Sequence, residues 1–153
     1  MQEYQIPKIQ SHVEVHLESG KVYKGSFYLS TNNPQFSGPQ RLEDFFEQDK
    51  EFLPMHLDDD TFRFINKHHV TFLISDEKDR AHLENDLALS ATLVDITFSD
   101  GSALSGEAFP DMPEGRRRAS DFFNQTATFL PLYQGDQKLI INKASVLFFR
   151  ETE

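Results

Sequence analysis

The stretch INKHHVTF (65–72) returns later in the chain as INKASVLF (141–148), and this repetition decides the fold. Five more blocks match in the same order: 15–17 with 96–98, 19–20 with 100–101, Gly25 with Gly106, 41–46 with 118–123, and 52–54 with 129–131. An ordered series of matches is typical of a duplicated structural unit. The sequence therefore predicts two copies of one unit of roughly sixty residues, at 10–75 and 91–150, joined by an acidic linker at 76–90.

Each copy has the pattern of β-structure. Val13, Val15 and Leu17 alternate with polar residues, as do the apolar residues at 94, 96 and 98, which is the period of a half-buried strand. The pairs 19–20 and 100–101 end in glycine and indicate hairpin turns, because glycine accepts the positive φ that such turns require. Gly25 and Gly106 sit at matching places inside the next strand, where a residue without a side chain favours a bend or bulge.

A short helical turn is expected after the second strand of each copy. In the second copy we predict Ser120 as the N-cap of a turn that places Phe122 and Phe123 in the core. Two short strands follow around a polar turn, and a nearly apolar last strand ends each copy. The fold class is therefore all-β, as two tandem five-stranded SH3-like or Sm-like barrels, each with one short helical turn.

This order of motifs resembles the Sm-like (LSm) barrel, whose closing motif commonly reads Ile-Arg-Gly-x-x-Ile or Val. The resemblance covers most of both copies, with an Asp-Phe-Phe block that looks like an uncharacterised bacterial branch of tandem Sm-like barrels. Sm-like proteins form rings and bind single-stranded RNA, which implies closing-loop roles for Asn66, Lys67, Asn142 and Lys143. Here the Arg-Gly pair is Asn-Lys and the loop after the second strand is longer. The resemblance therefore carries a fold and leaves the activity open.

Composition narrows the function classes. The chain of 153 residues has 25 acidic and 15 basic residues, a net charge of −10, and no cysteine. This charge disfavours a general nucleic-acid binder, since phosphate contacts need an excess of basic residues. Disulfides and thiolate metal sites are excluded by the lack of cysteine. We expect a cytoplasmic protein, because the sequence has neither a secretion signal nor an apolar run long enough for a membrane span.

The polar motifs have two interpretations each. The Asn-Lys pairs either bind a phosphate or nucleotide, or form tight turns between the last two strands. Arg41 either holds an anion or pairs with Asp44 on one side of the helical turn. The cluster Arg116, Arg117 and Arg118 either meets an acidic partner or nucleic acid, or is a solvated loop.

Signatures of catalysis and of metal binding are not found in the sequence. The six histidines are not spaced as ligands of one ion, and no nucleophile motif, phosphate loop or paired-carboxylate pattern is present. We therefore expect no enzyme, no cofactor and no metal. Most of the 15 phenylalanines are expected to fill two small cores.

The sequence thus favours a non-enzymatic interaction or assembly module. Small barrels leave strand edges that must be paired or protected, so we expect contact with another protein or with a second copy of this chain. The sequence leaves open whether the two copies pack edge to edge. The alternative is single-stranded RNA or nucleotide binding through the Asn-Lys loops and the Arg116–Arg118 cluster.

Overall fold

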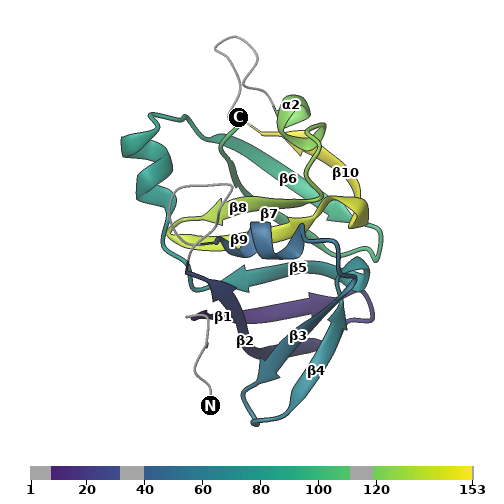
Figure 1. Ribbon diagram of the computed structural model, residues 1–153. Helices are drawn as coiled ribbons and strands as arrows, with labels where there is room; N and C mark the ends of the chain where they lie inside the picture. The colour runs from purple at the N-terminus through teal and green to yellow at the C-terminus, as the bar shows by residue number, and fades with distance from the viewer. Residues whose placement is uncertain (1–7, 32–39, 111–118, 153) are drawn as a thin grey trace.

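Ten strands form one antiparallel sheet in the computed structural model, which describes residues 8–31, 40–110 and 119–152 (Figure 1). The prediction of an all-β protein is confirmed. The strands are β1 (Lys8–Leu17), β2 (Val22–Ser30), β3 (Phe52–Leu57), β4 (Phe62–Asn66), β5 (Val70–Ser75), β6 (Thr92–Phe98), β7 (Ala103–Ala108), β8 (Phe129–Gln134), β9 (Gln137–Asn142) and β10 (Val146–Glu151).

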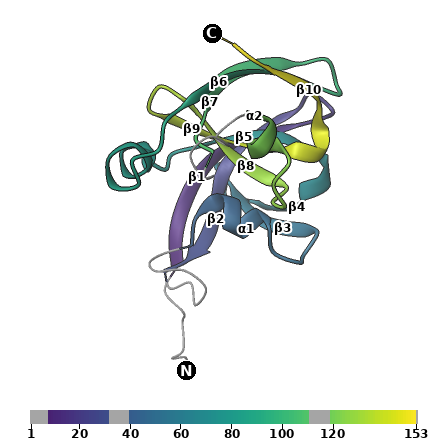
Figure 2. The same cartoon turned by 90° about the horizontal axis from the view of Figure 1, so that it is seen from above.

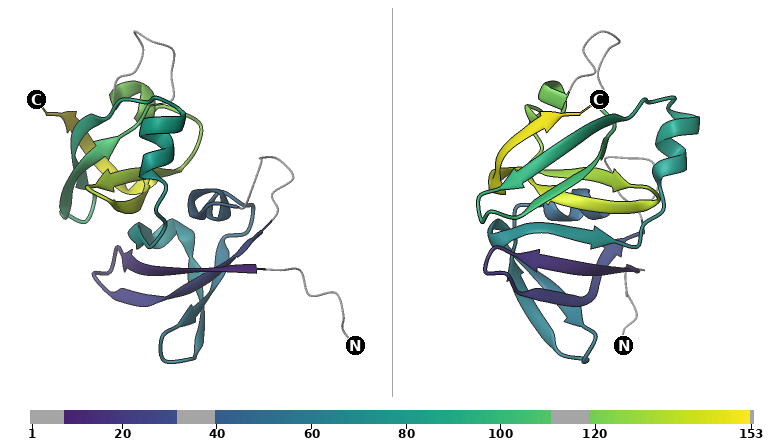
Figure 3. Two further views of the ribbon diagram at one scale, coloured as in Figure 1. Left: turned by 90° about the vertical axis from the view of Figure 1, so that its left-hand side faces the viewer. Right: turned by 180° about the vertical axis from the view of Figure 1, so that it is seen from behind.

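The strand order repeats, as the sequence repeat does. The first unit runs β5-β1-β2-β3-β4 across the sheet, and the second runs β10-β6-β7-β8-β9. The two units lie one above the other in the left panel of Figure 3. The sheet ends at β4 and β10, and neither strand has a second pairing partner among the described residues. Closure of each unit into a barrel therefore stays a prediction.

A one-turn helix follows the second strand of each unit, as expected. Helix α1 spans Leu42–Phe46 and α2 spans Ala119–Phe123, and both insert two phenylalanines into a core. The predicted N-cap is wrong, because Ser120 is the second residue of α2 and lies inside the helix. The error is small and leaves the phenylalanine pair where the sequence placed it.

Turns and caps follow from local chemistry. Gly20 and Gly101 have φ values of 91° and 90°, which confirms the two predicted hairpin turns. One turn of 3-10 helix joins the last two strands of each unit, as η1 (Lys67–His69) and η3 (Lys143–Ser145). Asn66 and Asn142 cap these turns, since each side-chain oxygen accepts a hydrogen bond from the amide two residues later.

The linker contributes structure of its own. It contains a short π-helix, η2 (His82–Asp86), which projects at one side of the sheet in Figure 2. Leu83 and Leu89 pack with Phe109 and Tyr133 in a small apolar cluster against the second unit. The linker is therefore attached to the second unit as well as continuous with the first.

Gly25 and Gly106 bring the second and third strands of each unit close together. A methyl group at Gly25 would lie 2.3 Å from the His56 carbonyl oxygen, which is backbone and cannot rotate away. At Gly106 the nearest atom, at 2.7 Å, belongs to the Leu132 side chain, and the Tyr133 carbonyl oxygen lies 3.0 Å away. The sequence predicts a bend at these two glycines, and the structure shows a close approach of two neighbouring strands.

We predict that Gly25→Ala lowers the free energy of unfolding by about 2–3 kcal/mol and Gly106→Ala by about 1 kcal/mol. The order follows because the backbone obstacle is closer at Gly25, where the His56 carbonyl oxygen is 2.3 Å away, than at Gly106, where the Tyr133 carbonyl oxygen is 3.0 Å away. Urea denaturation of both variants measures the difference, with the exposed Lys24→Ala as a control that should stay within about 0.5 kcal/mol. Equal losses at both glycines would contradict this explanation.

Candidate assembly interface

The seam between the two units is an antiparallel pairing of β5 with β9. Its register sets Phe72 opposite Ile141, Leu73 opposite Ile140, Ile74 opposite Leu139 and Ser75 opposite Lys138. The two copies therefore pack edge to edge within one chain, a question that the sequence left open. The seam uses one edge from each unit, and these edges are not equivalent: the fifth strand of one copy meets the fourth strand of the other.

Side chains cross the seam in both directions. Phe129 and Ile140 of the second unit belong to the core of the first, and the rings of Phe129 and Phe46 lie 5.1 Å apart. In return, Phe72 and Ile74 of the first unit pack against the core of the second. Each core is therefore completed by the neighbouring unit.

A buried ionic cluster fixes the seam at one end. The Lys138 side chain is fully buried, and its ammonium lies 2.8 Å from Glu43, 2.8 Å from Glu77 and 2.7 Å from Asp79. These carboxylates come from α1 and from the linker, so a single lysine of β9 binds both segments. The Tyr133 hydroxyl donates to Asp79 at 2.5 Å, and the Leu42 amide donates to Glu77 at 3.1 Å.

The electrostatics of the cluster follow from burial and close opposite charge. Burial alone would lower the pKa of Lys138, but Glu43, Glu77 and Asp79 raise it above the usual lysine range. Burial likewise opposes the charge of Asp79, yet its contacts with Lys138 and Tyr133 hold its pKa below the usual value. Burial raises the pKa of Glu43. The lysine therefore stays charged in the folded protein, held by its surrounding carboxylates.

Further hydrogen bonds join the two units across the seam. The Asn142 side-chain amide donates to the Val70 carbonyl at 2.9 Å, across the gap between the last turn of the second unit and β5. The Glu47 carboxylate, at the end of α1, accepts from the amides of Thr128 at 2.7 Å and Phe129 at 3.2 Å. Asn142 has an asparagine counterpart in the first unit, Asn66, whereas the counterpart of Glu47 in the second unit is Asn124.

The free edges of the sheet carry exposed aromatic and aliphatic side chains. At one edge the exposed residues are Phe62 and Phe64 of β4 and Phe52 of the neighbouring β3, and at the other edge they are Leu147 and Phe148 of β10. The repeat makes Phe52 and Phe64 the counterparts of Phe129 and Ile140. At the seam those counterparts are 3% and 0% exposed, whereas Phe52 and Phe64 are 54% and 68% exposed. The free edges therefore expose apolar side chains whose counterparts in the repeat are buried at the seam.

A pocket of about 280 Å³ opens on the β10 edge. Its lining includes Phe123 and Asn124 from the end of α2, and Leu147 and Phe148 from β10. Phe123 is the counterpart of Phe46, against which Phe129 packs at the seam. The position of the pocket in the second unit is therefore equivalent to the position that Phe129 occupies beside Phe46 in the first unit.

The predicted site residues have the following positions. Lys67 and Lys143 donate from their ammonium groups to the carbonyls of Gln48 and Gln125, just beyond the ends of α1 and α2. Arg41 lies 3.5 Å from Asp79 through its guanidinium, and its main-chain amide donates to Asp44 at 3.2 Å. The lysines and Arg41 are therefore engaged within the fold. Arg116, Arg117 and Arg118 lie outside the described residues.

Sequence reasoning missed the exposed aromatics and Lys138. The sequence places most phenylalanines in the core, although Phe62 and Phe64 alternate with Arg63 on a strand that lies at an edge of the sheet. Comparing the two copies position by position would have shown Lys138 in the second where the first has Phe62. That exchange distinguishes the seam from the free edge.

The histidines do not gather. Each of the six lies beside a single carboxylate, as with His56 and Asp60 at 2.6 Å or His12 and Asp58 at 3.0 Å. Within residues 8–31, 40–110 and 119–152, no group of three or more His, Asp or Glu side chains is arranged to hold a metal ion. In those same residues, no helix has the length and apolar character needed to cross a membrane.

Comparison with known proteins adds no assignment. No family model, no curated protein and no solved structure matches the chain. Functional interpretation therefore depends on the geometry of the seam and the edges.

We predict that Lys138→Met destabilises the fold by about 3–5 kcal/mol at pH 7, because the carboxylates around Lys138 then lose their buried counterion. The deficit relative to the unmutated protein should shrink as the pH falls below about 4, where protonation removes the unpaired charges. In the unmutated protein, the lowered pKa of Asp79 also makes stability fall on acidification. Its stabilising contribution is present above the pKa of the unfolded state and is lost as the pH falls through the pKa of the folded state.

Urea denaturation at pH 7 and pH 3 measures both effects. Lys21→Met in the exposed first hairpin turn is the control and should change stability by less than about 0.5 kcal/mol. A Lys138→Met deficit that is equally large at both pH values would show that packing, rather than charge, explains the loss.

Proposed function

We propose that this protein is a non-enzymatic assembly module, in which β10 of one copy pairs with β4 of the next. Each unit would be a small Sm-like or SH3-like barrel, and the chain would act by binding rather than by catalysis. The single observation that carries the proposal is the mismatch in burial between the seam and the free edges. Side chains buried where the two units meet have apolar counterparts that are exposed where the sheet ends.

The seam supplies the register of the proposed contact. Transferring its pairs through the repeat sets Phe148 opposite Ile65, Phe149 opposite Phe64, Arg150 opposite Arg63 and Glu151 opposite Phe62. The strand pairing would be antiparallel, as in the seam. Among the described residues neither strand has a neighbour on its outer side, which is the usual starting point for strand addition.

Apolar burial would supply most of the affinity. Phe52 would enter the pocket beside Phe123, as Phe129 lies beside Phe46 at the seam. Phe64 and Phe148 would cover the cores of the opposite copies. Full burial of a phenylalanine side chain contributes about 1.5–3 kcal/mol before the costs of association, so these residues make a plausible central anchor.

The polar groups of the edges fit the same arrangement. Asn66 is the counterpart of Asn142, so its side-chain amide would donate to the Val146 carbonyl of the next copy. Among the four strand pairs, Arg63 and Arg150 form one like-charge contact, which is unfavourable. Asp95, 3.2 Å from Arg150, offsets part of that repulsion.

The contact joins two different surfaces, so it is heterologous. An open row of copies would keep one free β4 edge at one end and one free β10 edge at the other end. Heterologous contacts give rings when the rotation closes and filaments when it does not. A symmetric dimer through two like edges is a different arrangement, and variants can separate the two.

We predict that the unmutated protein sediments well above its monomer mass of 17.7 kDa, whereas Phe64→Glu and Phe148→Glu are each monomeric. Either substitution buries a charge in the proposed contact but leaves the exposed position of the single chain solvated. An equimolar mixture should form a dimer of twice 17.7 kDa and grow no further, because Phe64→Glu keeps its β10 edge and Phe148→Glu keeps its β4 edge.

Analytical ultracentrifugation of the separate and mixed variants is the measurement. Val22→Glu, which places the same charge on an exposed apolar position of β2, should assemble like the unmutated protein. A monomeric unmutated protein over the micromolar range would overturn the proposal. Persistent dimers of Phe64→Glu alone would indicate a symmetric contact instead.

A matched pair of asparagine variants tests the register. Aspartate retains the oxygen that caps the turn but loses the amide that crosses the seam. We predict that Asn142→Asp destabilises the single chain by about 1–3 kcal/mol, whereas Asn66→Asp changes the monomer by less than about 0.5 kcal/mol and weakens self-association about tenfold.

Urea denaturation in the monomeric Phe148→Glu background gives the stabilities, and sedimentation of Asn66→Asp alone gives the association constant. Unchanged association of Asn66→Asp would reject the transferred register while leaving edge pairing itself open to the mixing experiment.

A further inference from the structure

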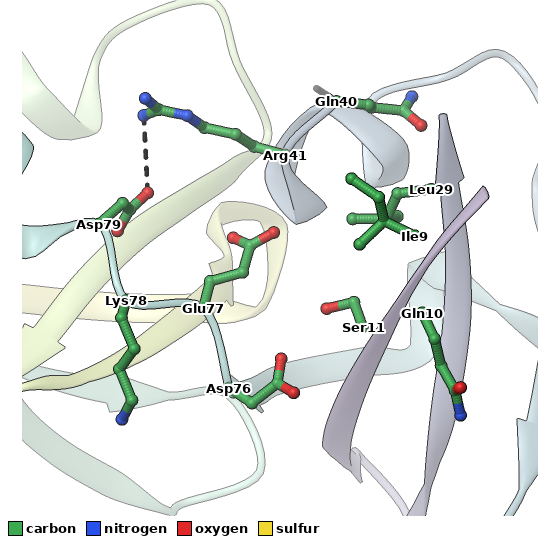
Figure 4. A pocket seen from close by; sticks show the side chains of 10 residues that line it. All are labelled: Ile9, Gln10, Ser11, Leu29, Gln40, Arg41, Asp76, Glu77, Lys78 and Asp79. Carbon is green, nitrogen blue, oxygen red and sulfur yellow. Dashed lines mark ion pairs between the residues drawn. The ribbon is translucent and has the colours of Figure 1, made fainter. Parts of the chain in front are cut away.

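A pocket beside the linker is independent of the free edges. It has a volume of about 360 Å³ and lies where the start of β1 and the end of β2 meet the first residues of the linker (Figure 4). Neither β4 nor β10 lines it. Its walls combine apolar side chains, carboxylates and one buried hydroxyl.

The buried hydroxyl belongs to Ser11. The residue is 3% exposed, and its Oγ has no hydrogen-bond partner among the described residues. Buried polar groups in folded proteins are nearly always paired, so an unpaired one calls for an explanation. In Figure 4 the hydroxyl points into the space between β1 and the linker, toward the side where Asp76 and Glu77 lie.

The carboxylates make one side of the pocket negative, with Asp76 exposed and Glu77 half-buried. Glu77 already binds Lys138 through one oxygen and the Leu42 amide through the other. The Asp76 carboxylate makes no ion pair or hydrogen bond among the described residues. Its charge is therefore available to a ligand.

The two cations of the pocket do not neutralise this negative side. The Arg41 guanidinium is turned to Asp79, 3.5 Å away, and the Lys78 side chain extends away from the centre in Figure 4. Ile9 and Leu29 form the opposite wall, where Leu29 is buried and Ile9 is partly exposed.

We propose that this pocket binds a small organic cation, an alkylammonium group on a short apolar stem. An ammonium has three donors and no acceptor, which matches the Asp76 carboxylate, the Ser11 hydroxyl oxygen and the acidic surroundings of Glu77. The stem would lie on Ile9 and Leu29. An anionic ligand would meet Asp76 and Glu77, and a neutral one would leave the Asp76 charge unpaired.

The first experiment compares n-butylammonium with n-butanol, which has the same stem and no charge. Titration followed by ¹H–¹⁵N NMR should show saturable shifts at the amides of Ser11, Asp76 and Glu77 with n-butylammonium, at least about tenfold weaker with n-butanol. Two further probes separate the sources of the cation: 1,4-diaminobutane represents a free polyamine, and Nα-acetyl-lysine amide represents a protein side chain.

Two variants connect binding to the residues. Asp76→Asn should weaken n-butylammonium binding about tenfold or more, and Asp136→Asn, an equal charge change in the exposed β8–β9 turn, should leave it unchanged. Ser11→Ala should weaken binding several-fold while keeping or raising the unfolding midpoint, because it removes an unpaired buried hydroxyl.

The titrations use the Phe64→Glu chain as well as the unmutated one. Binding to both supports the pocket whatever the assembly state, so failure here and failure of the assembly proposal remain distinguishable. Absence of saturable shifts with all three amines, or equal binding of n-butanol, would overturn the proposal. Binding unaffected by both Asp76→Asn and Ser11→Ala would place the cation elsewhere and overturn it too.

Discussion

The ammonium of Lys138 is the constraint on which the arrangement of the two units depends. A fully buried charge is tolerated only when oppositely charged groups surround it, and Glu43, Glu77 and Asp79 do so from α1 and the linker. The cluster therefore requires β9, α1 and the linker to be in place together. Since Tyr133 also binds Asp79 while Leu83 packs beside it, the linker is part of the folded structure and not a flexible tether.

The seam that this cluster fixes also determines what remains exposed. A pairing between two different edges leaves one edge of each kind unused when the unit is present only twice. Long apolar edges are a hazard for a single chain, and natural sheets usually protect them with charges or proline. Here β4 has one arginine between two exposed phenylalanines, and β10 exposes Leu147 and Phe148. The exposed apolar residues on these edges fit the proposed pairing with another strand better than they fit an edge that avoids pairing.

Much of the fold could be predicted from the sequence because its signals are local. The hairpin glycines, the strand alternation around Val15 and the phenylalanine pairs of α1 and α2 all depend on neighbouring residues. The seam depends on a contact between β5 and β9, which no local pattern encodes. The contacts of Lys67 and Lys143 could not be predicted for a related reason: both resemble exposed loop lysines until the distant carbonyls that they bind are known.

The exchange of Lys138 for Phe62 between the copies suggests why the two kinds of contact differ. Within one chain the linker holds the units close, so the seam needs specificity more than affinity, and a buried ionic cluster supplies it. Between chains the translational cost of association must be offset, and exposed aromatic side chains supply more net free energy than a buried ion pair. The counterpart of Glu43 in the second unit is Ser120, so a lysine at position 62 would have no matching carboxylate there. The different side chains at this one position thus keep the internal seam and the proposed external contact from replacing each other.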